Sequence, residues 1–357
     1  MPSKKETEHK EFTALYRKYR PHTFKDVIGQ DHIVSVLEGA IKLGNISHSY
    51  LFAGSRGTGK TSVARIFARA IGTSEKDMYE IDAASNRGID DIREVRDGVS
   101  TLPFDSKYKV YIIDEVHMLT KEAFNALLKT LEEPPSHAVF ILATTEMEKL
   151  PETIISRCQV FHFKKPNQAI LKSFALNIAK KEGFTLDPSA GELVAMLGDG
   201  SYRDTHGILQ KVLSSSEDNK VSLEEVETVT GAPKKTLVHE VISGIAQKDN
   251  SKALEALRKA SEGNIDMKLF GKLILQNLRF VLLLRYAPTM EKSIENEVSE
   301  DDFTFLKAIA MDKEVKINSE TLLEFLNAYD LISFSAVPEL PLELAIIKIV
   351  GQNNLTA

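Results

Sequence analysis

An eight-residue stretch near residue 55 has the composition and spacing needed to hold phosphate groups. Residues 54–61 read Gly-Ser-Arg-Gly-Thr-Gly-Lys-Thr, which matches the pattern G-x-x-x-x-G-K-[ST]. Glycines let the backbone fold so that its N–H groups point inward, and a helix that follows adds its positive dipole end. We therefore expect nucleotide contacts from Gly54, Ser55, Arg56, Gly57, Thr58, Gly59, Lys60, Thr61 and the adjoining Ser62.

Two residues of this stretch have distinct expected roles. Lys60 should reach the β- and γ-phosphates, and the Thr61 hydroxyl should bind Mg²⁺. The competing interpretation is a glycine-rich turn that fits the pattern by chance. An apolar run before the stretch and an amphipathic one after it predict a strand and a helix, and this context favours nucleotide binding.

A second chemical signal lies about fifty residues further on. The apolar run 110–113 is followed by Asp114 and Glu115. At the end of a strand, Asp114 would lie beside the phosphate-binding loop and hold Mg²⁺, while Glu115 would activate the attacking water. A solvated strand end is the alternative, but the loop upstream favours catalysis. His117 completes a D-E-x-H string and is expected to be structural.

The elements that position these residues alternate between strand and helix patterns up to about residue 163. Strands are expected at Tyr50–Ala53, Met78–Asp82, Lys109–Ile113, Ala138–Ala143 and Gln159–Phe163, with 3.6-period helices between them. This order predicts an α/β domain with a parallel five-stranded sheet. Beyond Pro166 only helical patterns remain, including long ones at 267–286, 320–334 and 342–350.

The chain therefore reads as three domains. We expect a disordered N-terminus at 1–11, an α/β nucleotide-binding domain at 12–165, a small helical domain at 166–231 and a larger all-helical domain at 232–357.

Composition excludes several classes of protein. Of 357 residues, 43% are hydrophobic and 27% charged, with a net charge of −6 and a single cysteine, Cys158. One cysteine excludes a disulfide framework and a cysteine-cluster metal site within the chain. No apolar run reaches the ~18 residues of a membrane helix, so we expect a cytoplasmic protein with no membrane partner. Taken alone, the acidic balance argues against a nucleic-acid partner.

Several longer stretches carry a specific resemblance. Residues 15–21, 80–93 and 114–135, the last ending in Leu-Glu-Glu-Pro-Pro, resemble the bacterial DNA polymerase III gamma/tau family, the AAA+ ATPases of the sliding-clamp loader. The resemblance is dense from residue 12 to about 213 and weaker beyond. It implies a lid and a collar domain after the AAA+ domain, ATP and Mg²⁺ as cofactors, and clamp loading as the function. It also implies five partners: a delta-type and a delta-prime-type subunit, copies of the chain itself, the sliding clamp and primer–template DNA.

The resemblance assigns roles to three further polar residues. Thr145 matches the sensor-1 position, and Arg157, within Ser-Arg-Cys at 156–158, matches a finger that enters the neighbouring subunit's ATP site. Arg203 matches the sensor-2 arginine of the lid, although residues 205–207 depart from the family pattern.

Weaker assignments concern the base and DNA. The stretch 16–30 would wrap the adenine, with Arg20, Val27 and Ile28 as the expected contacts, and Arg93 and Lys129 match positions that face DNA. A solvated helix face is the alternative for the last two.

One departure from the family has a chemical consequence. The four-cysteine zinc module common in the family is missing between residues 72 and 78, so we expect no structural zinc. The chain also stops just after the expected collar, like the short, loader-only form, and it carries no polymerase active site. Three rival interpretations remain: another AAA+ motor such as a branch-migration motor, a non-hydrolysing scaffold, and a P-loop small-molecule kinase.

Overall fold

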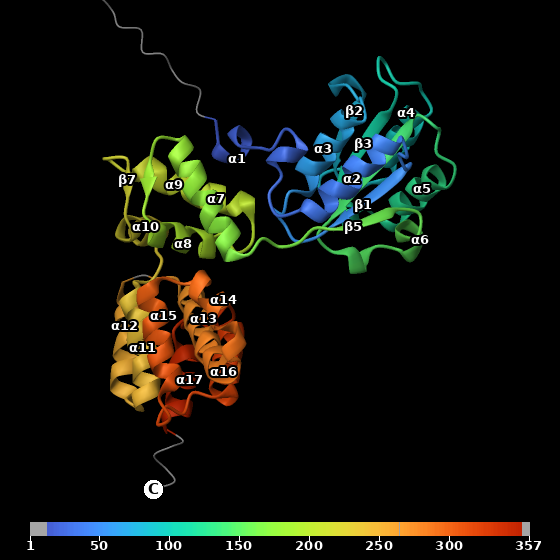
Figure 1. Cartoon of the computed structure of the whole chain (residues 1–357). Coiled ribbons are helices and arrows are strands. Elements are labelled where there is room, and N and C mark those ends of the chain that lie inside the picture. Colours follow the sequence, from blue (N-terminus) through green and yellow to red (C-terminus); the bar gives the residue numbers. More distant parts are fainter. Residues whose placement is uncertain (1–12, 264, 352–357) are drawn as a thin grey trace, which may run out of the picture. The chain divides into compact units, whose positions relative to one another are not determined.

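The computed structural model describes residues 13–263 and 265–351, which form two units (Figure 1). The first unit runs to Leu171 and includes Leu197–Gly207; the second comprises Lys172–Met196 and the chain from Ile208 onward. The predicted disordered stretch 1–11 lies outside the described residues, and the three-domain division stays a prediction. No helix in the described part of the chain has the length and apolar character needed to cross a bilayer.

A five-stranded sheet forms the centre of the first unit, and every neighbouring pair in it is parallel, as predicted. The strand order is β2-β3-β4-β1-β5. The strands are β1 Ser49–Ala53, β2 Met78–Asp82, β3 Lys109–Asp114, β4 Ala138–Thr144 and β5 Gln159–His162. Strands β3 and β4 each run one residue beyond the predicted end, which brings Asp114 and Thr144 into the sheet.

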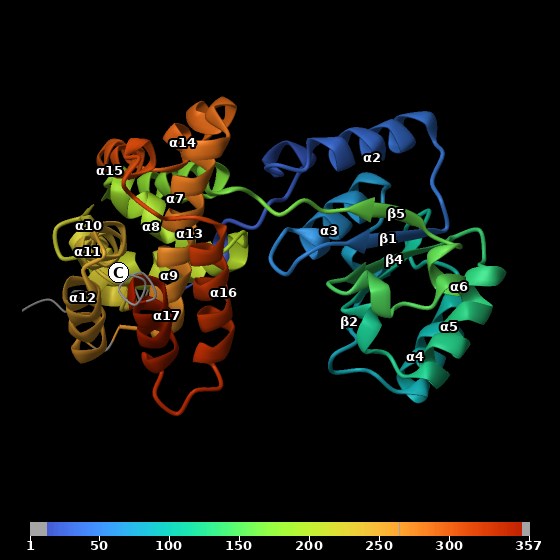
Figure 2. The ribbon, with the colours of Figure 1, turned by 90° about the horizontal axis from the view of Figure 1, so that it is seen from below.

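Helices cover both faces of this sheet because its central strands are apolar on both sides. Tyr50 and Phe52 of β1 pack with α2 Asp31–Leu43 and α3 Lys60–Ala70. Leu51, between them, points to the other face, with α4 Ile89–Val99 and α5 Lys121–Glu132. Figure 2 shows these two helical layers on opposite sides of the strands. Short elements complete the unit: α1 Leu15–Lys18, η1 Phe24–Asp26, η2 Glu75–Asp77, η3 Val116–Met118, η4 Met147–Lys149 and α6 Glu152–Ile155.

Four helices follow the sheet domain, as the apolar spacing predicts. They are α7 Gln168–Lys181, α8 Pro188–Leu197, α9 Tyr202–Ser215 and α10 Leu223–Thr230. The expectation that no strand occurs past Pro166 was wrong, because β6 Thr185–Leu186 pairs in parallel with β7 Lys220–Val221. Strands of two residues are too short to show the period-2 alternation on which the expectation depended.

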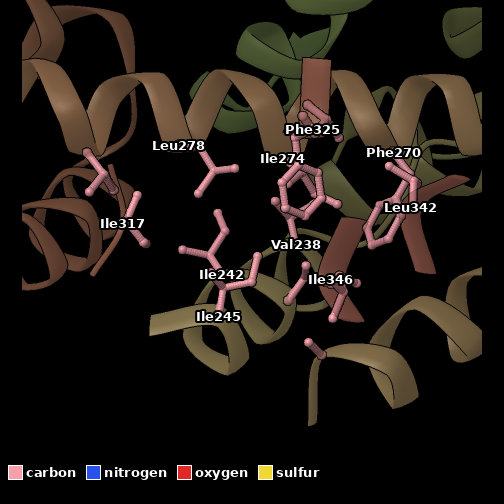
Figure 3. Close-up of a cluster of buried hydrophobic side chains, with 14 of the residues drawn as sticks. Val238, Ile242, Ile245, Phe270, Ile274, Leu278, Ile317, Phe325, Leu342 and Ile346 are labelled. Atoms are coloured by element: carbon pink, nitrogen blue, oxygen red, sulfur yellow. The ribbon is translucent and has the colours of Figure 1, made fainter. Parts of the chain in front are cut away.

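The remaining elements are helices packed around one apolar core. They are α11 Lys235–Gln247, α12 Asn250–Glu262, α13 Met267–Tyr286, η5 Pro288–Met290, α14 Glu291–Glu297, α15 Glu300–Met311, α16 Ser319–Ile332 and α17 Leu340–Gly351. Figure 3 shows Val238 and Ile242 of α11, Ile274 of α13, and Phe325 and Ile346 of α16 and α17 meeting in this core. The helix predicted at 267–286 has the observed bounds of α13.

Candidate nucleotide-binding site

The candidate site lies where three neighbouring strands end. Strand β4 lies between β1 and β3, and all three are parallel. Their carboxyl ends therefore bring together the loop that starts at Gly54, the pair Thr144-Thr145 and the pair Asp114-Glu115. In open parallel sheets, ligands bind at this edge. The two pairs lie about fifty and ninety residues after the loop in the sequence. The strand order alone brings them next to it.

The phosphate-binding loop needs glycine at two positions for a reason beyond flexibility. Gly54 and Gly57 have φ angles of +154° and +73°. A Cβ atom on Gly54 would lie 2.6 Å from the carbonyl oxygen of Phe163, and one on Gly57 would lie 1.9 Å from the Oγ of Ser201. Both contacts are shorter than atoms allow, so the loop keeps this path only with glycine.

Lys60 is folded into the loop that it belongs to. Its side chain is buried, and its Nζ donates hydrogen bonds to the carbonyl oxygens of Gly54 at 2.7 Å and Ser55 at 3.0 Å. Burial lowers the pKa of Lys60, against the opposing influence of the Glu115 and Asp114 carboxylates. The amine is therefore a buried cation donor at the centre of the loop, as phosphate binding requires.

The two expected magnesium ligands touch each other. The Thr61 hydroxyl donates to Oδ2 of Asp114 at 2.6 Å. A hydroxyl and a carboxylate side by side next to a phosphate-binding loop are the oxygen ligands that Mg²⁺ prefers, so these residues fit Mg²⁺. Within 13–263 and 265–351, no group of three or more His, Cys, Asp or Glu side chains could hold a metal. The expected lack of zinc stays a prediction.

Glu115 adopts a backbone conformation that is rare for its residue type. Its φ and ψ are 48° and 44°, in the left-handed region. Its amide donates to Oδ1 of Asp114 at 3.0 Å, and its Oε2 accepts a hydrogen bond from Thr145 at 3.0 Å. Strained backbone of this kind gathers at functional sites. The structure therefore brings Thr145 to the predicted pair of Asp114 and Glu115.

The predicted adenine stretch reaches the site through Arg20, whose Nε donates to the Ser62 hydroxyl at 3.2 Å. Burial, followed by the neighbouring Arg65, lowers the pKa of Arg20. Val27 packs against the core beneath α2 and α3, whereas the side chain of Ile28 is exposed.

The first residue of α9 contacts the same region. The Tyr202 amide donates to the carbonyl oxygen of Gly57 at 3.0 Å, and its hydroxyl donates to that of Ile28 at 2.9 Å. Burial raises the pKa of Tyr202 to about 12. The sequence predicts Arg203 as the site residue of this segment, and no pattern indicates Ser201 or Tyr202. The guanidinium of Arg203 is exposed and lies 5.6 Å from the centroid of the Tyr16 ring.

The remaining predicted residues lie on other parts of the first unit. Arg157 follows α6, and its guanidinium donates to the Glu132 carboxylate and to the carbonyl oxygen of Thr153. Arg93 lies on α4 and pairs with Asp90 at 2.8 Å, while Lys129 is exposed on α5.

His117 has more partners than a purely structural assignment suggests. Its Nδ1 lies 3.0 Å from Oγ1 of Thr144 and 3.5 Å from Oε2 of Glu115, and its Nε2 lies 2.9 Å from Oε2 of Glu146. The D-E-x-H string was the available signal. Glu146 carried no signal of its own, because it meets His117 only through the pairing of β3 with β4.

Comparison with known proteins agrees with this geometry. Residues 73–167 match the family model described as DNA polymerase III, delta subunit. The DNA polymerase III subunit tau of Bacillus subtilis is 37% identical over 372 residues, covering 97% of this chain and 64% of its own length. The DNA polymerase III subunit gamma of Buchnera aphidicola is 35% identical over 313 residues, covering 80% and 86%. This chain spans about half the length of the gamma/tau protein of Mycobacterium tuberculosis.

A solved structure supports the fold. The Holliday junction branch migration motor RuvB of Thermotoga maritima superposes with a TM-score of 0.52 at 21% identity, over 64% of this chain and 79% of that one. The strand order and the site thus define an AAA+ P-loop fold. The chain belongs to the DNA polymerase III gamma/tau family, which confirms the resemblance drawn from its motifs.

Proposed function

We propose that this chain is an ATPase subunit of a bacterial DNA polymerase III clamp loader, which binds and hydrolyses ATP at subunit interfaces, opens the sliding clamp and loads it onto primed DNA. The observation that carries the proposal is the hydrogen bond between Thr61 and Asp114, with Lys60 and Glu115 beside it. These four residues have the groups needed to bind phosphate, hold a metal ion and activate water. Membership of the gamma/tau family supports ATP as the nucleotide.

Each residue of the set has a separate task in the proposed reaction. Backbone N–H groups of residues 54–61 and the amine of Lys60 bind the β- and γ-phosphates. Thr61 and Asp114 would hold Mg²⁺, which when bound neutralises charge on those phosphates. Glu115 accepts a proton from the attacking water. The water oxygen bonds to the γ-phosphorus as the bond to the β–γ bridging oxygen breaks, giving ADP and phosphate.

Three further polar residues would complete the site, one of them from the neighbouring subunit. Arg157 would enter the ATP site of the neighbouring subunit and neutralise charge that develops on the transferred phosphoryl group, an effect worth ~10³–10⁵-fold in comparable enzymes. Thr145 would act as sensor 1 through its bond to Glu115, and Arg203 as sensor 2. A site built from two subunits makes hydrolysis depend on assembly.

The helical domain after residue 231 supports the proposed assembly. Helices α16 and α17 pack side by side, and each also exposes apolar side chains. These outer apolar side chains are Leu323, Leu326 and Leu331 of α16 and Leu340, Leu344 and Ile347 of α17. Large apolar side chains that gather on an exposed face mark interaction sites. We propose that copies of the chain and the delta- and delta-prime-type subunits cover them.

Binding of primer–template DNA would depend on a few cations. Arg93 and Lys129 remain our candidates, each for contact with one DNA phosphate. Recognition of the DNA backbone needs a few well-positioned cations, and the protein as a whole need not be basic.

The rival functions have less support. A non-hydrolysing scaffold gives no reason for the contacts among Thr61, Asp114, Glu115 and Thr145. The likeness to RuvB shows the fold alone, and a small-molecule kinase gives no reason for the helices from α11 to α17.

Steady-state ATPase activity tests the proposal. It is measured for the chain alone, with the other loader subunits, and with clamp and primed DNA added; we expect a rise at each addition. Lys60→Ala should abolish ATP binding, since it removes the buried cation. Unchanged nucleotide affinity in Lys60→Ala, or no hydrolysis by the complete mixture, would refute the proposal.

A further inference from the structure

A buried histidine lies between the catalytic-site glutamate and a second carboxylate. His117 is in η3, directly after β3, and its side chain is only 6% exposed. Its two ring nitrogens face opposite ways. Nδ1 faces Thr144 and Glu115, and Nε2 faces Glu146. A side chain with a polar partner on each nitrogen is held in one orientation.

Glu146 determines which nitrogen carries the proton. A carboxylate only accepts hydrogen bonds, so at 2.9 Å the Nε2 of His117 must donate to it. In the neutral ring Nδ1 is then an acceptor, and the Thr144 hydroxyl is the donor that it meets at 3.0 Å. The same hydroxyl accepts the amide N–H of Glu146 at 3.0 Å. His117, Thr144 and Glu146 thus form a closed set.

The outer end of this set is anchored as well. The ammonium group of Lys149 lies 2.7 Å from Oε1 of Glu146. This hydrogen bond and the charge of Lys149 keep the pKa of Glu146 below its usual value. Glu146 is therefore a fixed, ionised acceptor for the ring.

The Glu115 carboxylate is held through one of its two oxygens. Oε2 accepts the hydroxyl of Thr145 at 3.0 Å, whereas Nδ1 of His117, 3.5 Å from the same oxygen, is an acceptor and gives it no hydrogen bond. Among the residues that the structure describes, no hydrogen bond reaches Oε1. One oxygen is held, and the other is left to take a proton.

We propose that His117 is a positioning residue for the hydrolysis of ATP: through its hydrogen bonds to Thr144 and Glu146, on either side of Thr145, it holds the Thr145 hydroxyl on Oε2 of Glu115 so that Oε1 faces the attacking water. The proposal rests on the proposed ATPase function. His117 touches neither water nor phosphate in this account and acts on Glu115 through Thr145. A displacement of about 1 Å in a reacting group is enough to slow catalysis by roughly a hundred-fold.

Three substitutions separate the contact of His117 with Thr144 from its contact with Glu146. His117→Asn places an amide near the position of Nδ1, His117→Gln places one near Nε2, and His117→Ala removes both. ATPase activity is measured in the complex with the other loader subunits, clamp and primed DNA. We expect Ala and Gln to lower kcat roughly ten- to hundred-fold, with KM for ATP within about two-fold of the unchanged chain. Asn should recover most of kcat.

A matched control and a double variant make the test specific. His48→Asn changes an exposed histidine of the same unit and should leave kcat unchanged. In a Glu115→Gln background, His117→Ala should cause no further loss, because both changes remove one function. Equal activity of Asn, Gln and Ala, a parallel rise in KM, or a further loss in the Glu115→Gln background would each overturn the positioning role. A failure of the proposed function is distinguishable, since the unchanged chain would then not hydrolyse ATP in the complete mixture.

Discussion

The Nη2 atom of Arg157 lies 2.8 Å from the Oε1 atom of Glu132, at the end of α5. The Nη1 atom of the same guanidinium donates to the carbonyl oxygen of Thr153 at 2.7 Å. The proposed finger is thus bound to its own chain. Both side chains are partly exposed, 33% for Arg157 and 49% for Glu132, so the ion pair is worth no more than about 1 kcal/mol and can be exchanged for a phosphate.

Glu132→Gln should raise the ATPase activity of the assembled loader, by up to about five-fold, because the neutral amide competes less with the neighbouring site for Arg157. The measurement is kcat in the reconstituted complex without DNA. Glu133→Gln, one residue further on and also exposed, is the matched control and should change nothing. A fall in kcat for Glu132→Gln would show that the pair aligns the finger instead of holding it back.

A second pairing connects the segment before β2 with the loop before β3. The carboxylate of Asp77 is fully buried, and it accepts the backbone N–H groups of Phe104, Asp105 and Ser106 at 2.6, 3.1 and 3.0 Å. Burial alone would raise the pKa of Asp77, but these hydrogen bonds outweigh it and lower the pKa to about 2. One carboxylate thus fixes the loop that leads into β3.

Asp77→Asn should destabilise the first unit by about 1–3 kcal/mol at neutral pH, since hydrogen bonds to a charged acceptor become bonds to a neutral one. The pKa of Asp77 is lower in the folded chain than in the unfolded chain. Its contribution is therefore complete above about pH 4 and is lost as the pH falls toward 2. Denaturant unfolding from pH 6 to pH 2.5 measures this. Asp97→Asn, at an exposed position, is the control. A difference between the Asp77 variant and the unchanged chain that stays constant with pH would contradict the assignment.

The outer apolar side chains of α16 and α17 give a third prediction. Leu344→Glu should weaken assembly with copies of the chain and with the other loader subunits by ten-fold or more, because burying one leucine contributes about 1.5–3 kcal/mol. Leu344 is 57% exposed, so the fold of its own domain should keep its stability. Sedimentation velocity of the mixture measures assembly, and thermal unfolding measures stability. Leu43→Glu, at an exposed leucine of the first unit, serves as the control. Unchanged assembly would remove these helices from the proposed interface.

Contiguous motifs predicted the centre of the site well. Lys60, Thr61, Asp114 and Glu115 lie in short patterns whose spacing requires a strand before and a loop after, so their meeting follows from the parallel sheet. Contacts between distant segments could not be predicted. The approach of Ser201 to Gly57 and the pairing of His117 with Glu146 depend on backbone paths that no local pattern contains. Strands of two residues, such as β6, could not be predicted because they are too short to show the alternation of a strand. The roles of Arg203, Arg93 and Lys129 stay predictions.

The left-handed backbone of Glu115 has a consequence for the history of such chains. A glutamate in this conformation costs roughly 1–2 kcal/mol that glycine would not. Glycine at this position would therefore stabilise the chain and remove the carboxylate that we propose for hydrolysis. A copy that no longer uses this carboxylate would gain stability from the replacement. Glutamate at position 115 is therefore expected to persist only where the carboxylate is still used.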